Sequence, residues 1–72
     1  SLGSENVSVE EYLALGDAAL AGKQLSEAEE AYSKALKLAA DNKDQKLAAE
    51  AKLRLSRVRY GQALALYTAG KF

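Results

Sequence analysis

Residues 12–19, YLALGDAA, and residues 28–35, AEEAYSKA, decide the fold of this chain. In the first stretch an aromatic residue is followed by the pair Leu15-Gly16, and in the second Tyr32 stands between small residues. Glycine and alanine let two helix backbones approach closely, and the aromatic rings fill the space around them. The two stretches therefore predict a pair of closely packed helices.

The first stretch has signals for a helix end on each side. Ser8-x-x-Glu11 is a capping box, and it opens a segment with apolar residues at helical spacing. Gly22 closes the segment as a residue suited to a left-handed helix stop. We expect a helix over about residues 9–21.

The second stretch begins only a few residues later. Ser26-x-x-Glu29 is a second capping box, and Leu25 before it can act as a hydrophobic staple. We expect a helix over about residues 26–40. The short connection makes these two helices an antiparallel hairpin.

A third helix is expected after a polar turn at residues 41–44, in which Asp44 is a suitable N-cap. From Gln45 to Ala69 only Gly61 interrupts the helix-forming residues. Glycine costs about 1 kcal/mol in a helix interior and can mark a kink or a break. We nevertheless expect one long helix over this span, about twice the usual length.

The composition favours an all-α fold and excludes several kinds of site. Helix formers dominate, and proline is absent. Without cysteine or histidine the chain has no disulfide and lacks the commonest metal ligand and general base. The adjacent pairs Glu10/Glu11 and Glu29/Glu30 point about 100° apart on a helix instead of converging. We therefore predict no enzyme, no cofactor and no metal site.

The organisation of the chain is simple. Residues 1–8 are expected to be a disordered N-terminal segment or a cloning scar, and residues 9–72 a single domain. No apolar run is long enough for a bilayer, so we expect no membrane insertion. No signal peptide is visible, and this, with the absence of cysteine, favours a cytoplasmic location.

The two halves of the chain differ in charge, although the net charge is zero. Residues 1–36 carry seven acidic and two basic side chains, and residues 37–72 carry three acidic and eight basic ones. A neutral total disfavours a dedicated nucleic-acid-binding protein. The polarity is better suited to orienting the third helix against the first two, or one copy against another.

The expected third helix has two apolar faces. One can cover the hairpin and consists of Leu47, Ala48, Ala51, Leu55, Val58, Ala65, Leu66 and Ala69. Since a lone surface helix has one apolar stripe, the opposite side either folds back onto the hairpin, is simply exposed, or forms an interface. We predict a protein interface there, made by Leu53, Arg57, Tyr60, Leu64 and Tyr67.

Residues 9–40 resemble the tetratricopeptide repeat, a 34-residue helix–turn–helix unit. The residues at the packing positions of that family are Tyr12, Leu15, Gly16, Ala19, Ala28, Tyr32 and Ala35. Ala19 replaces the usual tyrosine, and Ala40 stands where the family often has proline. The resemblance implies a scaffold that binds other proteins. It also implies an altered or truncated second repeat in the third helix, with residues 68–72 similar to the turn before a further helix.

The same resemblance implies a groove lined by the inner side of the first helix. The positions are Glu10, Leu13, Asp17 and Leu20. Family members that hold the carboxylate of a chaperone tail use a lysine and an asparagine where this chain has Leu13 and Asp17, so such docking is not implied here. If Ala49 opens the second repeat, Arg57 is equivalent to Asp17, and a contact between the two is expected.

We therefore expect an all-α domain, made of a tetratricopeptide-like antiparallel hairpin and a long third helix. It would act as a non-catalytic protein–protein interaction module. Its partner would be a protein or peptide, a second copy in a homo-oligomer, or adjacent repeats of a longer parent. The alternative is a resemblance to the microtubule-interacting-and-trafficking domain, which implies a monomer that binds amphipathic helical peptides beside its third helix.

Overall fold

Three α-helices make up the computed structural model, which describes residues 7–70. They are α1 (Val9–Ala21), α2 (Leu25–Asp41) and α3 (Gln45–Thr68). The expected all-α arrangement of a hairpin and a long third helix is confirmed. The expectations for residues 1–6, and for the last two residues of the turn at 68–72, lie outside the described residues.

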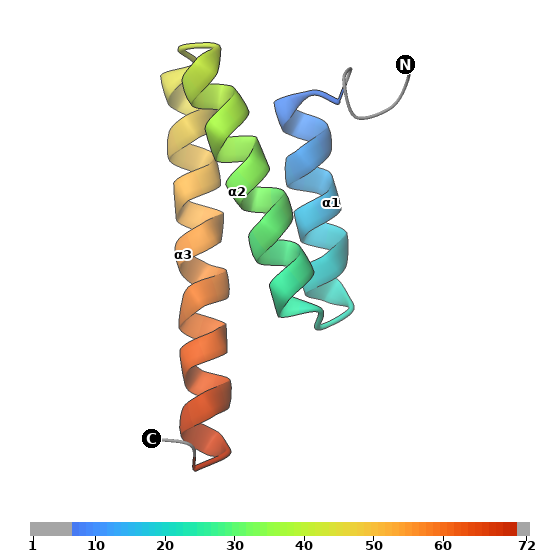
Figure 1. The fold of residues 1–72 in the computed structure, drawn as a ribbon, viewed down its shortest axis with the longest axis vertical. Helices are drawn as coiled ribbons and strands as arrows, with labels where there is room; N and C mark the ends of the chain where they lie inside the picture. The colour runs from blue at the N-terminus through green and yellow to red at the C-terminus, as the bar shows by residue number, and fades with distance from the viewer. Residues whose placement is uncertain (1–6, 71–72) are drawn as a thin grey trace.

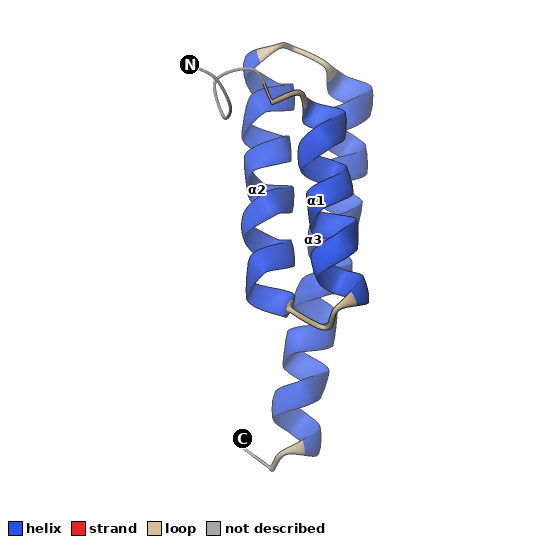
Figure 2. Ribbon diagram, turned by 90° about the vertical axis from the view of Figure 1, so that its right-hand side faces the viewer, coloured by secondary structure: helices blue, strands red, loops and turns tan. Residues whose placement is uncertain are grey.

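The middle helix, α2, holds the other two helices in place. It lies between α1 and α3 and packs against both, whereas α1 and α3 have little contact with each other (Figure 1). At 1.5 Å per residue α3 is about 36 Å long and α1 about 20 Å. Figure 2 shows the consequence, because α3 continues well beyond the loop that joins α1 to α2.

The core forms where the faces of the three helices meet. Its buried residues are Val9, Leu13, Ala28, Tyr32, Ala35, Ala39, Ala51, Leu55 and Val58. α1 and α2 approach each other closely at Gly16, where an added Cβ would overlap ring carbons Cδ1 and Cε1 of Tyr32. This observation confirms that the pattern at residues 12–19 and 28–35 encodes a close helix crossing.

The first and third helices begin as expected. The Ser8 side chain accepts a hydrogen bond from the Glu11 backbone N–H, and the Glu11 carboxylate accepts one from the Ser8 N–H, which completes the capping box. At the start of α3 the Asp44 carboxylate accepts from the Leu47 N–H at 3.1 Å. Both caps satisfy backbone donors that a helix leaves without an internal partner.

The second capping box is a wrong prediction. The N-cap of α2 is Gln24, whose carbonyl accepts from the Ala28 N–H at 3.0 Å, so Ser26 lies inside the helix. Glu29 makes contacts with α3 instead, accepting hydrogen bonds from Arg59 at 3.3 Å and Gln62 at 3.2 Å. The cause is the preceding turn, which reverses the chain early enough for Leu25 to be helical.

The expected left-handed stop at Gly22 is also wrong. Gly22 has φ −86° and remains in the last helical turn, while Lys23 takes the left-handed conformation with φ 61°. The turn between α2 and α3 has the same geometry, with Lys43 at φ 59°. In both turns the N-cap N–H donates to a carbonyl five residues back, from Gln24 to Ala19 and from Asp44 to Ala39.

The third helix runs without a break through Gly61, as expected. Its covering face, however, is shorter than predicted, because Ala65, Leu66 and Ala69 are exposed. By their helical spacing these residues do lie on the side of α3 that packs against the hairpin. The hairpin, however, ends before it reaches this part of α3. Within residues 7–70 no helix combines the length and the apolar character needed to cross a bilayer.

Candidate functional site

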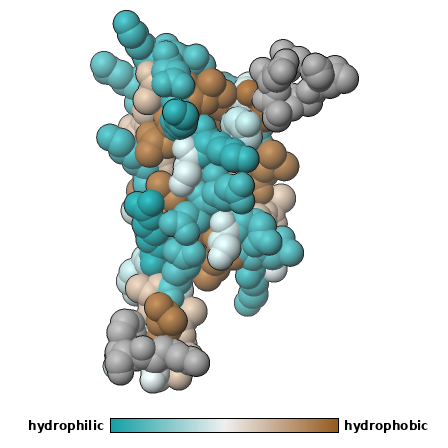
Figure 3. Space-filling model, in the orientation of Figure 1, coloured by the Kyte–Doolittle hydropathy of each residue, from teal (hydrophilic) through white to brown (hydrophobic). Residues whose placement is uncertain are grey.

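One side of α3 is apolar and faces away from α2. Leu53, Tyr60 and Leu64 are 45%, 69% and 47% exposed, and we refer to these three as the free face of α3. Tyr67, which is 70% exposed, lies on the same side of the helix. The residues of the free face do not fold back onto the hairpin, because the stripe that contacts α2 is on the opposite side of the helix and contains Ala51, Leu55 and Val58. Figure 3 shows apolar surface on the protruding end of α3.

The spacing along the free face is that of a helix-packing seam. Leu53, Tyr60 and Tyr67 are seven residues apart. The small residues Ala49, Ser56 and Ala63 alternate with them, each four residues before the next large one. All six positions are exposed. A heptad with a large residue at one seam position and a small one at the other suits insertion of side chains into a facing helix.

Basic side chains flank this free face. α3 carries Lys46, Lys52, Arg54, Arg57 and Arg59 against the single acid Glu50, a net charge of +4. Arg57 is exposed beside the seam. The segment from Tyr60 to Gly70 contains no charged residue, so the protruding end of the helix is uncharged all round.

A polar groove lies between α1 and α3, with α2 as its floor. The groove has a volume of about 260 Å³ and is lined by Asp17, Leu20, Tyr32, Glu50, Arg54 and Arg57. Three predicted site residues, Asp17, Leu20 and Arg57, therefore do meet there. The predicted pairing of Asp17 with Arg57 is wrong, however, because Asp17 binds Arg54 Nη1 at 2.9 Å.

A chain of polar contacts crosses the groove and joins all three helices. The Tyr32 hydroxyl of α2 donates to Asp17 Oδ1 of α1 at 2.5 Å, and Arg54 of α3 also binds Glu50 at 2.8 Å. Burial raises the pKa of Tyr32 to about 12, and the hydrogen bond and negative charge of Asp17 act in the same direction. The Glu50 hydrogen bond and the Asp17 carboxylate raise the pKa of Arg54.

The other two predicted groove residues are placed differently. Leu13 is 5% exposed and belongs to the core between the helices, so its side chain does not line the groove. Glu10 is exposed on the first turn of α1 and is not among the groove-lining residues. The groove is lined by two carboxylates, of Asp17 and Glu50, and by two guanidinium groups, of Arg54 and Arg57, so its charges balance.

The outer face of α1 also has apolar surface, which the sequence analysis missed. Leu15 is 56% exposed, although it belongs to the pattern that packs the hairpin. With Val7, Glu11 and Ala14 it lines a hollow of about 330 Å³. The signal in the sequence was that residues 9–21 have apolar side chains on every side of the helix, which a helix with a single buried stripe does not need.

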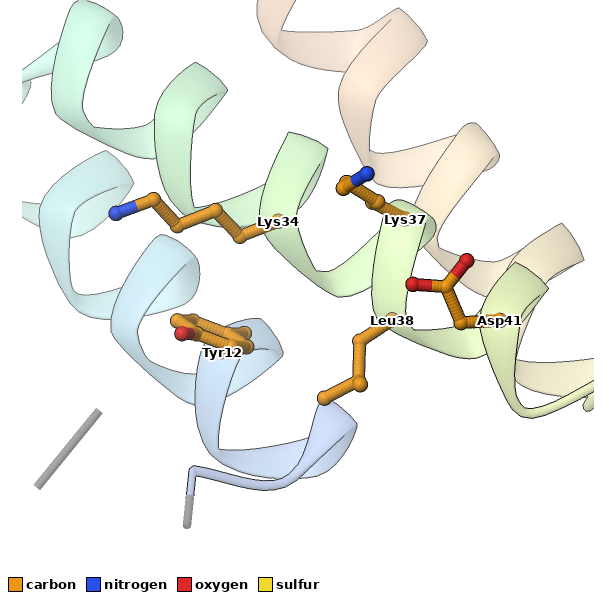
Figure 4. Close-up of a pocket in the computed structure, with 5 residues that line it drawn as sticks. All are labelled: Tyr12, Lys34, Lys37, Leu38 and Asp41. Atoms are coloured by element: carbon orange, nitrogen blue, oxygen red, sulfur yellow. The ribbon is translucent and has the colours of Figure 1, made fainter. Parts of the chain in front are cut away.

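A further hollow of about 380 Å³ follows the contact between α1 and α2. Its lining residues are Tyr12, Lys34, Lys37, Leu38 and Asp41. Figure 4 shows Lys34 and Leu38 extending from α2 toward α1 on either side of Tyr12. Tyr12 and Leu38 are partly buried against the core, and Lys34 pairs with Glu30 at 3.4 Å. Packing of the hairpin therefore explains this hollow.

In comparisons with models of protein families, with curated proteins and with solved structures, nothing matches this chain. The function is therefore inferred from the chain's own surfaces.

Proposed function

We propose that this chain is a non-catalytic protein–protein interaction module that self-associates or docks a protein partner through the free face of α3. The observation that carries the proposal is the exposed apolar seam, which lies opposite the stripe that contacts α2. Large apolar side chains in a contiguous row on a small domain are typical of an interaction surface. Burying them contributes about 25 cal/mol per Å² of apolar area, less the cost of association.

The hairpin supports a tetratricopeptide-like architecture for the module. α1 and α2 pack closely where Gly16 meets the ring of Tyr32, and Ala28 and Ala35 of α2 are fully buried. These are the positions at which the resemblance places small and aromatic residues. In a module of this kind α3 would be the first helix of a second, altered repeat, and its free face would receive the next element or another chain.

Sedimentation velocity over a range of protein concentrations tests the proposal. We expect the sedimentation coefficient to rise with concentration for the native chain and to stay that of a monomer for Tyr60→Ser. Leu66→Ser is the matched control, because Leu66 is 50% exposed on the same protruding end but lies off the seam. A native chain that stays monomeric and binds no partner through this face would sink the proposal.

The alternative function is a monomeric receptor for amphipathic helical peptides. It is supported by the same heptad spacing, because a seam of alternating large and small residues suits any helix with a complementary stripe. Titration with helical peptides separates the two functions. Saturable binding without a change in oligomeric state favours the receptor, and concentration-dependent mass without peptide favours self-association.

A further inference from the structure

We infer that copies of this chain associate head to tail, with the free face of α3 in one copy against the outer face of α1 in the next. The outer face of α1 consists of Glu11, Ala14, Leu15 and Ala18, and Val7 adjoins it just before the helix begins. The inference rests on the proposed self-association and names its geometry. It is carried by the position, the charge and the shape of the two faces.

The two faces lie at opposite edges of the molecule. α2 separates α1 from α3, and each outer helix has a side that faces away from it (Figure 1). Leu15 is 56% exposed on α1, and Tyr60 is 69% exposed on α3. Each copy therefore has two separate apolar edges, and a contact that used only α3 would leave the α1 edge uncovered.

The charges of the two edges are opposite. Outside the ion pairs within the fold, α1 carries Glu10 and Glu11 and no basic residue, whereas α3 carries Lys46, Lys52 and Arg57. Two α3 helices packed along their full length would bring basic side chains of residues 46–59 near one another, which disfavours that symmetric contact. α3 against α1 places Arg57 and its basic neighbours opposite an acidic helix, which favours the pairing and guides its orientation.

The shapes of the two edges are complementary as well. The seam of α3 projects the large side chains of Leu53 and Tyr60. The outer face of α1 offers the small residues Ala14 and Ala18 one turn apart, beside the hollow of about 330 Å³. A large side chain from one helix enters the space above small residues on another, as in other close helix contacts.

Two different faces that meet do not close the assembly. When two unlike surfaces meet, each pair of copies still has one unused α1 edge and one unused α3 edge. Further copies can therefore add until the assembly forms a long chain or closes into a ring, whereas a symmetric contact stops at a dimer. The number of copies that associate therefore distinguishes the two geometries. Because the attraction is partly electrostatic between exposed groups, association should also weaken as salt shortens the screening length from about 10 Å at 0.1 M to about 3 Å at 1 M.

A complementation experiment with two blocked variants tests the inference. Ala14→Arg blocks the α1 edge, and Tyr60→Glu blocks the α3 edge. Both positions are exposed, and both new residues are good helix formers. We expect the native chain to form species larger than a dimer, each variant alone to be a monomer, and an equimolar mixture of the variants to form a dimer and nothing larger.

Matched controls separate edge effects from effects on folding. Ala40→Arg introduces the same charge at an exposed site on α2, and Leu66→Glu introduces an acid on the protruding end away from the seam. Both controls should associate as the native chain does. Circular dichroism of all four variants should give native helicity.

The other possible outcomes contradict either the head-to-tail geometry or the self-association itself. If Ala14→Arg associates as the native chain does while Tyr60→Glu does not, the contact is α3 against α3. The head-to-tail inference is then wrong, and the proposed self-association stands. The same conclusion follows if the mixture of variants stays monomeric while the native chain associates. If the native chain itself does not associate, both the inference and the self-association fail.

Discussion

At the scale of single residues, Gly16 and Tyr32 determine how closely α1 and α2 approach. The Tyr32 ring is 1% exposed and fills the space that a side chain at position 16 would need. Its hydroxyl is held by Asp17, so the ring has little freedom to move aside. The geometry of the hairpin therefore depends on glycine, which has no side chain, at position 16.

Gly16→Ala should lower the free energy of unfolding. The new methyl group overlaps buried ring carbons of Tyr32, and overpacking of this kind costs roughly 1–3 kcal/mol. The gain in helix propensity of about 1 kcal/mol offsets only part of that cost. Urea unfolding followed by circular dichroism measures the change. An unchanged or raised midpoint would show that the two helices are not in this close contact.

The phenol of Tyr32 should make the protein less stable at high pH. Its pKa is about 12 in the fold and 10.0 for an ordinary tyrosine, so the fold favours the neutral form. This stabilisation is complete below pH 10 and is lost as pH rises from 10 to 12. A shift of two units corresponds to about 2–3 kcal/mol.

Urea unfolding of the native chain and of Tyr32→Phe, at several values between pH 8 and pH 12, measures this loss. The variant should show the smaller dependence on pH in that window. Tyr60→Phe is the control, because it removes the same hydroxyl from a tyrosine that is 69% exposed and lies outside the core. Identical pH profiles for native protein and Tyr32→Phe would contradict the assignment.

At the scale of elements, the two turns reverse the chain through lysines in the left-handed conformation. Lys23 and Lys43 both have positive φ, which costs an L-residue roughly 1–2 kcal/mol but costs glycine nothing comparable. The two turns nevertheless have matching backbone hydrogen bonds. The backbone hydrogen bonds at the helix ends therefore compensate for the strain of the two lysines in the left-handed conformation.

Lys23→Gly and Lys43→Gly should each raise the free energy of unfolding by roughly 0.5–1 kcal/mol, because glycine removes the strain but adds freedom to the unfolded chain. The control is Lys37→Gly, which makes the same change at an exposed position inside α2. It should lower stability by about 1 kcal/mol. The prediction fails if all three variants are destabilised equally in urea unfolding.

The long helix α3 should tolerate, and gain from, a side chain at Gly61. An added Cβ at this position meets nothing within 4 Å, and the helix is continuous on both sides. Gly61→Ala should therefore raise the free energy of unfolding by about 1 kcal/mol, the opposite sign to Gly16→Ala. Calorimetry or urea unfolding checks the sign, and a destabilised variant would indicate that α3 needs a bend there.

At the scale of the whole molecule, stability should be unevenly distributed. Residues 63–70 are all exposed, whereas the core gathers where α2 meets α1 and α3. Amide hydrogens of residues 63–68 should exchange through local fraying, and those of residues 28–39 only through global unfolding. Hydrogen exchange followed by NMR measures this gradient in a dilute sample.

The same gradient should become weaker as copies associate. Amides near Tyr60 and Tyr67 should gain protection when the protein concentration rises, whereas those in the core of α2 should not change. Tyr60→Glu serves as the control, because the blocked variant should keep its low protection at every concentration. Protection that is uniform along α3 at low concentration would mean that its end is held by contacts within the chain.

The asymmetric charge of the chain acts at this scale too. Some of the charged side chains form ion pairs within the fold: Arg54 pairs with Asp17, and Arg59 pairs with Glu29 on a neighbouring helix. These pairs are partly or largely exposed, so each contributes only about 0–1 kcal/mol. The remaining charges, with α1 acidic and α3 basic, are available for contacts between copies.

Local signals in the sequence determined the helices and two of their caps. The Ser8-x-x-Glu11 spacing, Asp44 before residue 45, and the absence of proline act within one turn of helix, so they can be read without the fold. The residue pattern around Gly16 and Tyr32 also predicted the close packing of α1 against α2, because a small residue leaves space that an aromatic ring on the neighbouring helix can fill. The free face of α3 was likewise visible as a second apolar stripe.

The tertiary structure alone decided which of two equivalent arginines binds Asp17, where the chain reverses, and how much of α3 is covered. Arg54 and Arg57 differ by less than one turn, so only the crossing of the helices selects Arg54. Lys23 reverses the chain although Gly22 is the better candidate by type. Leu66 has the phase of a buried residue but is exposed, because coverage depends on the length of the neighbouring hairpin and not on the helix itself.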